Sequence, residues 1–220
     1  MERGYQLEIY YHDSLPSTHR FLEEGLRTKK LTPPLAIIAN SQTEGIGSRG
    51  NAWTGLEGNL FLSFCLSKEA LPSDLPLAST SIYFSFIMIE VFKELGSKTW
   101  LKWPNDFYLG DKKLGGTITT VISDKFILCS MGINLKNAPK DFEIIDINIE
   151  KHLLIEKYFL KLKQVIFWKD VFRQYEIEFE KSRCFFYTDR ASGKKISLKN
   201  ATLLEDGSIM IENKRIYSLR

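Results

Sequence analysis

Helix-like and strand-like segments alternate along this chain, and the alternation limits the fold more than any other feature of the sequence. The strongest segment covers residues 79–95, where Ile82, Phe86 and Ile89 recur near helical spacing and Gly96 follows as a stop signal. The predicted strands are residues 35–39, 59–65 and 98–103, and residues 117–122 and 125–132 form a predicted hairpin across Ser123 and Asp124. A fold that combines a sheet with helices follows.

Three further segments complete the outline of the main part of the chain. A short helix begins at Ser17 or Thr18, since either hydroxyl can serve as the N-cap. Residues 45–58 contain five glycines in fourteen positions and are predicted to be a loop. A long helical stretch, broken once, covers residues 151–181, and its lysine-rich face is most simply a solvated face.

The C-terminal tail differs in character from the rest. From Lys194 onward, short β-type runs are separated by Asp206-Gly207 and by Asn213-Lys214, which both favour hairpin turns. These signals predict a small all-β module that begins near residue 187. At about 34 residues the module is too small to be stable alone, so it must pack against the main domain.

Composition is that of an ordinary globular protein. The chain has 220 residues, 44% of them hydrophobic, which is enough to bury a core without disulfides or a structural metal. Cys65 and Cys129 lie in apolar strand-like runs and are predicted to be buried free thiols. The net charge of +3 is too weak to imply nucleic-acid binding, and no signal peptide or membrane-spanning run is present. We therefore expect a cytoplasmic protein with no nucleic-acid or membrane partner.

The segment from Gln42 to Trp53 is rich in glycine. Glycines at 45, 47 and 50 allow the backbone to approach a ligand closely, and Arg49 offers a planar fork to a phosphate. A flexible surface loop is an equal alternative on this segment alone. It is neither a dinucleotide-binding fingerprint nor a P-loop, because no helix pattern and no Gly-Lys-Ser/Thr follow.

Three polar motifs interrupt the predicted strands. Residues 102–106 read Lys-Trp-Pro-Asn-Asp, residues 113–116 read Lys-Leu-Gly-Gly, and residues 132–135 read Gly-Ile-Asn-Leu. The lysines, asparagine and aspartate would need partners or water if buried, so a wall that binds a nucleotide and a carboxylate suits them better than a plain core strand. Capping residues in turns, a surface hairpin lysine and a strand-end asparagine are the structural alternatives.

These motifs together resemble one family, the biotin–protein ligases. Ser17-Thr18-His19 resembles the family's Ser-Thr-Asn, Gln42 stands at its glutamine before the glycine loop, and the motifs at 102–106, 113–116 and 132–134 match its signatures in order. The resemblance spans about residues 8–136 and extends to the closing strand at residues 216–220.

The resemblance implies an α+β fold. A mixed β-sheet flanked by helices, like that of class II aminoacyl-tRNA synthetases, would form a catalytic domain over residues 1–185. A short C-terminal SH3-like β-domain would cover residues 186–220. Because the motifs begin near residue 8, no room remains for the winged helix of some members, so we expect the monofunctional form.

The resemblance also implies an activity. Biotin and ATP would give biotinyl-5′-adenylate and pyrophosphate, and a lysine of a biotin carboxyl carrier protein or carrier domain of a carboxylase would then take the acyl group and release AMP. Magnesium would enter on the ATP phosphates, with no metal ligand from the protein. Homodimers are common among members of this size, so a homodimer is expected.

Site residues follow from the resemblance, position by position. Lys113 would neutralise the biotin carboxylate and the α-phosphate, Arg49 would contact the phosphates, and Asp106 would orient the acceptor amine or take its proton. The biotin-binding residues would be Ser17, Thr18, His19, Gln42, Gly45, Ile46, Gly47, Ser48, Lys113, Gly115 and Gly116. The ATP-binding residues would be Arg49, Trp53, Lys102, Asn105, Lys113 and Asn134.

The glycine loop departs from the family pattern. Ile46, Ser48 and Asn51 stand where the family has arginines, and the arginine at the Ser48 position helps the family to retain the adenylate. We therefore expect either that Arg49 takes over this role or that the adenylate is released more readily. The family's glutamate after the Gly-Gly strand is also missing, and Thr119 or Thr120 stands there.

Three other functions compete with this one. A lipoate–protein ligase shares the fold but would carry a different lysine-centred motif without Trp-Pro-Asn-Asp. A non-catalytic module would bind biotin yet fail to exchange pyrophosphate into ATP. A nucleic-acid-binding protein fits poorly with the near-neutral charge.

Overall fold

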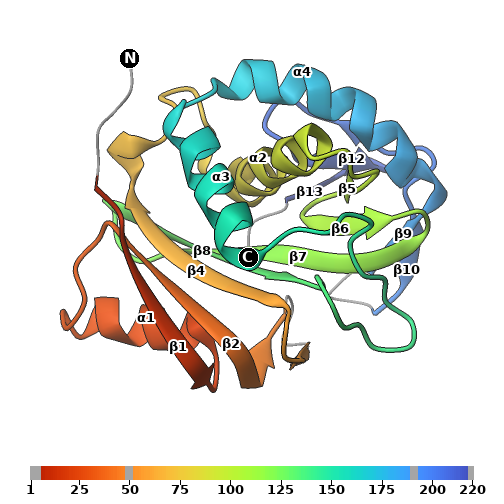
Figure 1. Cartoon of the computed structure of the whole chain (residues 1–220). Helices are drawn as coiled ribbons and strands as arrows, with labels where there is room; N and C mark the ends of the chain where they lie inside the picture. Colours follow the sequence, from red (N-terminus) through yellow and green to blue (C-terminus); the bar gives the residue numbers. More distant parts are fainter. Residues whose placement is uncertain (1–5, 48–51, 189–192, 218–220) are drawn as a thin grey trace.

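The computed structural model describes residues 6–47, 52–188 and 193–217, and within them eight strands form one mixed sheet (Figure 1). The strand order is β1-β2-β4-β8-β7-β6-β5, and β3 pairs with β2. Strands β1 and β2 are parallel, whereas the other pairs are antiparallel. The strands are β1 (Glu8–Leu15), β2 (Leu35–Ile46), β3 (Ala52–Gly55), β4 (Leu60–Ser67), β5 (Trp100–Lys102), β6 (Asp106–Leu109), β7 (Lys112–Val121) and β8 (Phe126–Ile133). The predicted mixed sheet is confirmed.

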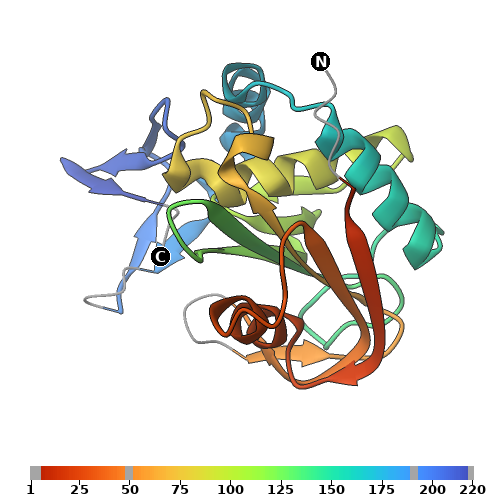
Figure 2. The ribbon, with the colours of Figure 1, turned by 90° about the vertical axis from the view of Figure 1, so that its left-hand side faces the viewer.

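Helices cover both faces of this sheet, as the two ribbon views show (Figures 1 and 2). Helix α1 (Thr18–Arg27) lies against one face, where Leu22 packs with Cys65 and Leu128. Helices α2 (Thr80–Glu94) and α3 (Lys151–Lys163) lie on the other face, and α4 (Trp168–Phe179) packs beside α2 and β5. Among the described residues, short 3₁₀ helices cover Lys68–Ala70, Leu77–Ser79 and Glu180–Cys184.

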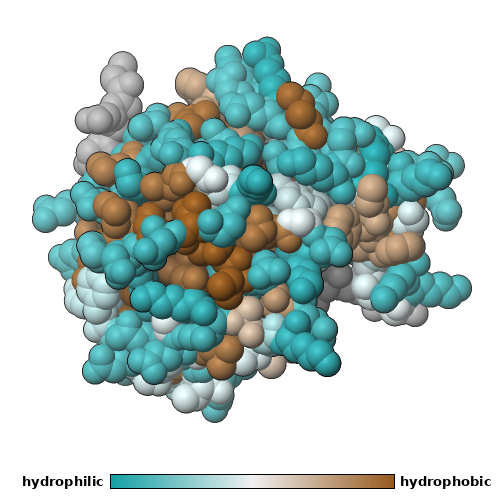
Figure 3. Space-filling view, turned by 45° about the vertical axis from the view of Figure 1, so that its right-hand side comes forward, coloured by the Kyte–Doolittle hydropathy of each residue, from teal (hydrophilic) through white to brown (hydrophobic). Residues whose placement is uncertain are grey.

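The predicted helix signals act as expected. Ser17 is the N-cap of α1, and its hydroxyl accepts a hydrogen bond from the Arg20 amide. Helix α2 ends at Glu94, and Gly96 follows with a φ of +86°. The stretch at 151–181 breaks between α3 and α4, with Lys157 and Lys169 exposed. The surface over the top of the molecule, where α4 lies, is mostly hydrophilic, as a solvated face should be (Figure 3).

The C-terminal segment forms two small sheets. Strands β9 (Phe186–Thr188) and β10 (Lys195–Ser197) pair, and β11 (Thr202–Leu203), β12 (Ile209–Ile211) and β13 (Lys214–Ile216) form the second sheet. The turns fall at both predicted sites, since Gly207 and Asn213 have positive φ angles. Leu198, Ile209 and Ile216 belong to the same core as α2 and α4, so the module leans on the main domain, and its strands fit an SH3-like module. The boundary at residue 186 stays a prediction.

Two expectations about the loops and strands were incomplete. Residues 45–58 were predicted to be a loop, but β2 continues to Ile46 and pairs with β3. Strand β1 was not predicted, because residues 8–13 are largely exposed and mix charged with aromatic side chains. Cys65 and Cys129 are buried free thiols, as predicted. In the part of the chain that the structure describes, no helix is long and apolar enough to cross a bilayer.

Candidate active site

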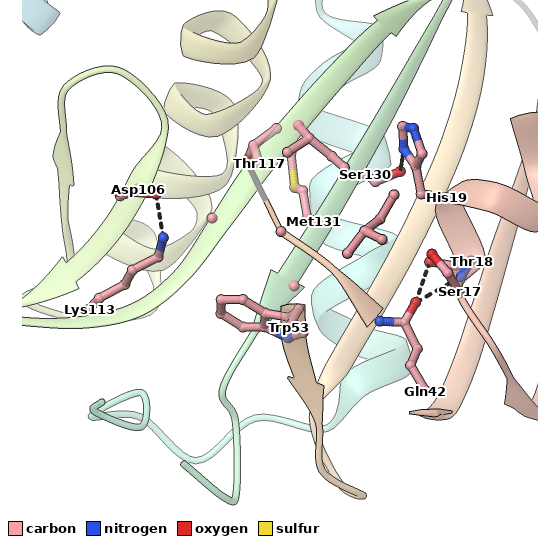
Figure 4. A pocket seen from close by; sticks show the side chains of 15 residues that line it. Ser17, Thr18, His19, Gln42, Trp53, Asp106, Lys113, Thr117, Ser130 and Met131 are labelled. Atoms are coloured by element: carbon pink, nitrogen blue, oxygen red, sulfur yellow. Dashed lines mark hydrogen bonds and ion pairs between the residues drawn. The ribbon is translucent and has the colours of Figure 1, made fainter. Parts of the chain in front are cut away.

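A pocket opens on the α1 face of the sheet, at the N-terminus of α1 (Figure 4). Elements far apart in the sequence meet there, because β2, β4, β8 and β7 are neighbours in the sheet and α1 crosses them. The lining residues are Ser17, Thr18, His19, Gln42, Ile46, Gly47, Trp53, Asp106, Lys113, Gly116, Thr117, Ile118, Ser130, Met131 and Gly132.

A β-bulge turns Lys113 into this pocket. Along β7, the hydroxyls of Thr117 and Thr119 bond to α2, whereas Thr120 bonds to His19 of α1. Strict alternation would send Lys113 to the α2 side with Thr117. The register shifts between Phe107 and Tyr108, however, so that Phe107 faces Gly115 and Tyr108 faces Lys113. The extra residue reverses the alternation and places the lysine on the pocket side.

Two lysines flank one carboxylate at the end of the pocket. The Lys113 Nζ lies 2.6 Å from the Asp106 Oδ1, and the Lys102 Nζ lies 4.0 Å from the Asp106 Oδ2. The side chain of Lys113 is 25% exposed, that of Lys102 12% and that of Asp106 19%. In such a partly buried site, cations attract anions more strongly than in water. Lys113, which lines the pocket, can therefore neutralise two anionic groups that must be brought together, such as a carboxylate and a phosphate, while Lys102 adds positive potential from beside Asp106.

A continuous chain of hydrogen bonds forms the polar floor of the pocket. Gln42 Oε1 accepts from the Thr18 amide at 2.8 Å and from the Thr18 hydroxyl at 3.0 Å. The Ser63 hydroxyl donates to the Thr18 hydroxyl at 2.8 Å and lies 2.7 Å from that of Ser130. The His19 Nδ1 lies 2.8 Å from the Ser130 hydroxyl. These five side chains join α1, β2, β4 and β8 into one polar network.

Trp53 forms the wall opposite Lys113. Its indole ring packs directly on Gly132, since a Cβ at that glycine would lie 2.9 Å from the ring. The Lys113 Nζ lies 5.9 Å from the centre of the same ring, within range of a cation–π interaction. The pocket thus presents an aromatic face near the Lys113 cation, and a residue larger than glycine at position 132 would displace the ring.

Burial determines the charge state of His19. The imidazole is 6% exposed, and this burial lowers its pKa below the ordinary value. Glu23 on the same helix raises the pKa and Arg20 lowers it, both by less than the burial does. The ring is therefore neutral near pH 7.

This lowered pKa predicts a loss of stability in acid. Below the ordinary histidine pKa of about 6.5, His19 binds a proton in the unfolded chain but stays unprotonated in the folded protein. The free energy of unfolding therefore falls as the pH drops toward the folded pKa. The loss from this group can reach about 1.4 kcal/mol per pH unit. Urea unfolding between pH 7.5 and 5.5 should give a steeper decline for the wild type than for His19→Asn. Equal slopes would show that His19 does not contribute.

Comparisons with known proteins identify the family of this chain. The model of the biotin/lipoate A/B protein ligase family matches residues 11–135, which include every lining residue of the pocket. The chain belongs to the biotin/lipoate A/B protein ligase family.

The family relatives include solved structures and curated proteins. A biotin acetyl coenzyme A carboxylase synthetase from Helicobacter pylori, with bound biotinylated ATP, is 42% identical with a TM-score of 0.91, covering 96% of this chain and 100% of that one. A biotin protein ligase from Aquifex aeolicus, in complex with biotin and ATP, is 20% identical with a TM-score of 0.75, covering 97% and 96% of the two chains, and shows the fold.

Curated members of the family are longer than this chain. The bifunctional ligase/repressor BirA of Bacillus subtilis is 29% identical over 143 residues, which are 61% of this chain and 42% of that protein. The chain thus spans less than half the length of this relative.

Most of the residues predicted from the family resemblance meet in the pocket. Ser17, Thr18, His19, Gln42, Ile46, Gly47, Trp53, Asp106, Lys113 and Gly116 line it. Gly45, Gly115 and Lys102 are not among the lining residues, although the Lys102 Nζ lies 4.0 Å from the Asp106 carboxylate. Ser48, Arg49 and Asn51 lie outside the described residues, so the predictions on them remain untested.

Two predicted ATP ligands of the family occupy structural positions instead of the lining. Asn105 is 3% exposed and its side-chain amide donates to the Thr117 carbonyl. Asn134 is 1% exposed, donates to the Glu143 carbonyl at 3.2 Å, and accepts from Asn59 at 3.3 Å. Both side chains therefore brace the backbone on which the pocket is built, and their role toward a nucleotide stays a prediction.

Five lining residues were not predicted as site residues: Thr117, Ile118, Ser130, Met131 and Gly132. The sequence does carry a signal for Ser130, because its hydroxyl interrupts an apolar strand, as the hydroxyl of Ser63 does in another strand. Buried polar groups in such runs need partners, and here they find each other across β4 and β8.

Proposed function

We propose that this protein activates biotin with ATP as biotinyl-5′-adenylate and transfers the biotinyl group to a specific lysine of a biotin carboxyl carrier domain. The observation that carries the proposal is Lys113, which the β7 bulge directs into a pocket with a polar floor and an aromatic wall. The similarity to the Helicobacter pylori synthetase over nearly the whole chain supports it. Biotin and ATP are then the substrates.

Activation requires a carboxylate to attack the α-phosphate. Both groups are anionic, so the approach is slow unless cations neutralise the charge that builds in the transition state. Lys113, which pairs with Asp106 in this structure, would do this once it turns to the substrates. Lys102 stays beside Asp106 and adds positive potential behind it. The oxygen of the biotin carboxylate forms the new bond to phosphorus, and pyrophosphate leaves.

Transfer requires a neutral amine at the acceptor lysine. An ordinary lysine has a pKa near 10.4, so deprotonation at pH 7 costs roughly 4.6 kcal/mol. Asp106 lines the pocket and can orient the amine or take its proton when Lys113 is engaged with the phosphate. The amine nitrogen bonds to the biotinyl carbon and AMP leaves, so no covalent enzyme intermediate is needed.

The overall reaction is tested with ATP, magnesium, biotin and a carrier domain, followed by intact mass measurement of the carrier. One added biotinyl group per carrier is the expected result. Lipoate in place of biotin tests the alternative within the same family, and selective lipoylation would overturn the proposal. Biotin binding without pyrophosphate exchange into ATP would indicate the non-catalytic module instead.

Asp106→Asn should separate the two steps. The amide keeps the shape but neither accepts a proton nor pairs with Lys113, so transfer should slow by about 10²-fold and activation by less. Pyrophosphate exchange reports activation, and single-turnover transfer from preformed adenylate reports the second step. Asp111→Asn, an exposed aspartate in the neighbouring turn, is the matched control. Equal losses in both steps would contradict the amine role.

Several finer points belong to the same proposal. Magnesium would accompany ATP on its phosphates. The acceptor would be a carboxylase subunit such as that of acetyl-CoA carboxylase. The enzyme would be a cytoplasmic homodimer. Arg49 would help the site to retain the adenylate. Labelling of bystander lysines tests retention, because released adenylate modifies them.

A further inference from the structure

His19 is a buried titratable residue that neither proposed chemical step uses. Its ring lies at the far end of the polar floor, bonded to Ser130 on one side and 3.3 Å from the Thr120 hydroxyl on the other. Glu23 lies 3.7 Å from Nε2, and Arg20 is the other charged neighbour. An apolar residue would fill the same space without needing three polar partners.

The direction of every hydrogen bond in the floor follows from one backbone group. The Thr18 amide can only donate, so the atom of the Gln42 side chain that faces it must be the oxygen. The Thr18 hydroxyl must then also donate to that oxygen, and its own oxygen accepts from Ser63. The Gln42 nitrogen is left on the pocket side, turned away from Thr18 (Figure 4).

The same reasoning continues to the histidine. The single proton of Ser63 is given to Thr18, so Ser130 must donate to Ser63. The single proton of Ser130 is then used as well, and its oxygen accepts from His19. In a neutral ring the proton therefore sits on Nδ1, and Nε2 accepts from the Thr120 hydroxyl.

We propose that His19 is a positioning residue, whose Nδ1–H anchors a one-way hydrogen-bond chain through Ser130, Ser63 and Thr18 that holds Gln42 with its Nε2 donor toward the ligand. The chain selects a ligand with a hydrogen-bond acceptor at this end of the pocket, such as the urea oxygen of biotin. The choice of that ligand rests on the proposed function, whereas the proton positions do not.

Three variants test the chain. His19→Leu removes the donor, and Ser63→Ala cuts the chain beneath the pocket without touching the lining. Each should weaken biotin binding by about five- to tenfold, as expected for one lost hydrogen bond, with kcat at saturating biotin little changed. His19→Asn keeps an N–H near the position of Nδ1 and should restore the affinity to within about threefold. His152→Leu, an exposed histidine on α3, is the matched control.

The side-chain ¹⁵N shifts of the three histidines give a second measurement, made without ligand. A proton on Nδ1 and a bare Nε2 at His19 are expected at pH 7. A proton on Nε2 would overturn the proposal, as would equal losses of affinity in His19→Asn and His19→Leu. If the wild-type protein fails to bind biotin, the proposed function is wrong, and the ¹⁵N spectrum still decides whether the chain exists.

Discussion

Lys113→Ala is expected to lower the rate of biotin-dependent pyrophosphate exchange by roughly 10²- to 10³-fold, the usual loss when a group that stabilises transition-state charge is removed. The bulge in β7 directs this lysine into the pocket, and no other described lysine lines it. Lys102 stands on the far side of Asp106, so it cannot take over the contact without leaving its own position.

The fold should survive this substitution. Solvent reaches both members of the Lys113–Asp106 pair, and Asp106 keeps Lys102 as a neighbour, so the free energy of unfolding should fall by less than about 2 kcal/mol. Lys112→Ala, the exposed lysine next to it on β7, is the matched control and should exchange pyrophosphate like the wild type. Wild-type exchange in Lys113→Ala would remove the lysine from the mechanism.

The position of Lys113 shows how far sequence patterns reach. The Lys-Leu-Gly-Gly motif marked the lysine as a candidate, yet alternation along β7 would have placed it on the α2 side. Its true direction depends on a register shift against β6, which is a property of two strands together. Side-chain direction at a bulge therefore cannot be derived from one segment.

Strands that are buried on both faces could be predicted from the sequence, whereas an exposed strand could not. Strand β4 is apolar at nearly every position because helices cover both sides, and its pattern was clear. Strand β1 is an edge strand whose Tyr10 and Tyr11 are exposed, so it lacked that signal.

Asn105 and Asn134 carried strong motif signals, but the sequence could not tell a ligand contact from a backbone brace. Only the hydrogen bonds to Thr117 and Glu143 reveal the bracing role.

The turn at residues 205–207 connects the C-terminal module to the motif at residues 102–106. Trp168 Nε1 donates to the Glu205 carbonyl at 2.8 Å, the Ser79 hydroxyl donates to the Asp206 carbonyl, and Trp103 Nε1 donates to the Gly207 carbonyl at 2.9 Å. Three side-chain donors from the main domain thus hold three successive carbonyls. Because Trp103 lies three residues before Asp106, this clamp also fixes the segment that carries the carboxylate.

Gly207→Ala should break this clamp and destabilise the protein by about 2–4 kcal/mol, measured by urea unfolding. The residue has a φ of +73°, and an added Cβ would lie 2.7 Å from the Ile82 Cδ1 and 3.0 Å from the Ser79 hydroxyl. Gly96→Ala isolates the backbone contribution and should cost only about 1 kcal/mol, since Gly96 has a φ of +86° and no other described residue, its two chain neighbours aside, comes within 4 Å of its Cβ position. Pyrophosphate exchange should fall in Gly207→Ala and not in Gly96→Ala, because only the former displaces Trp103. Equal destabilisation in both variants would contradict the prediction, because it would show that the Cβ added at position 207 meets no steric obstacle at Ile82 and Ser79.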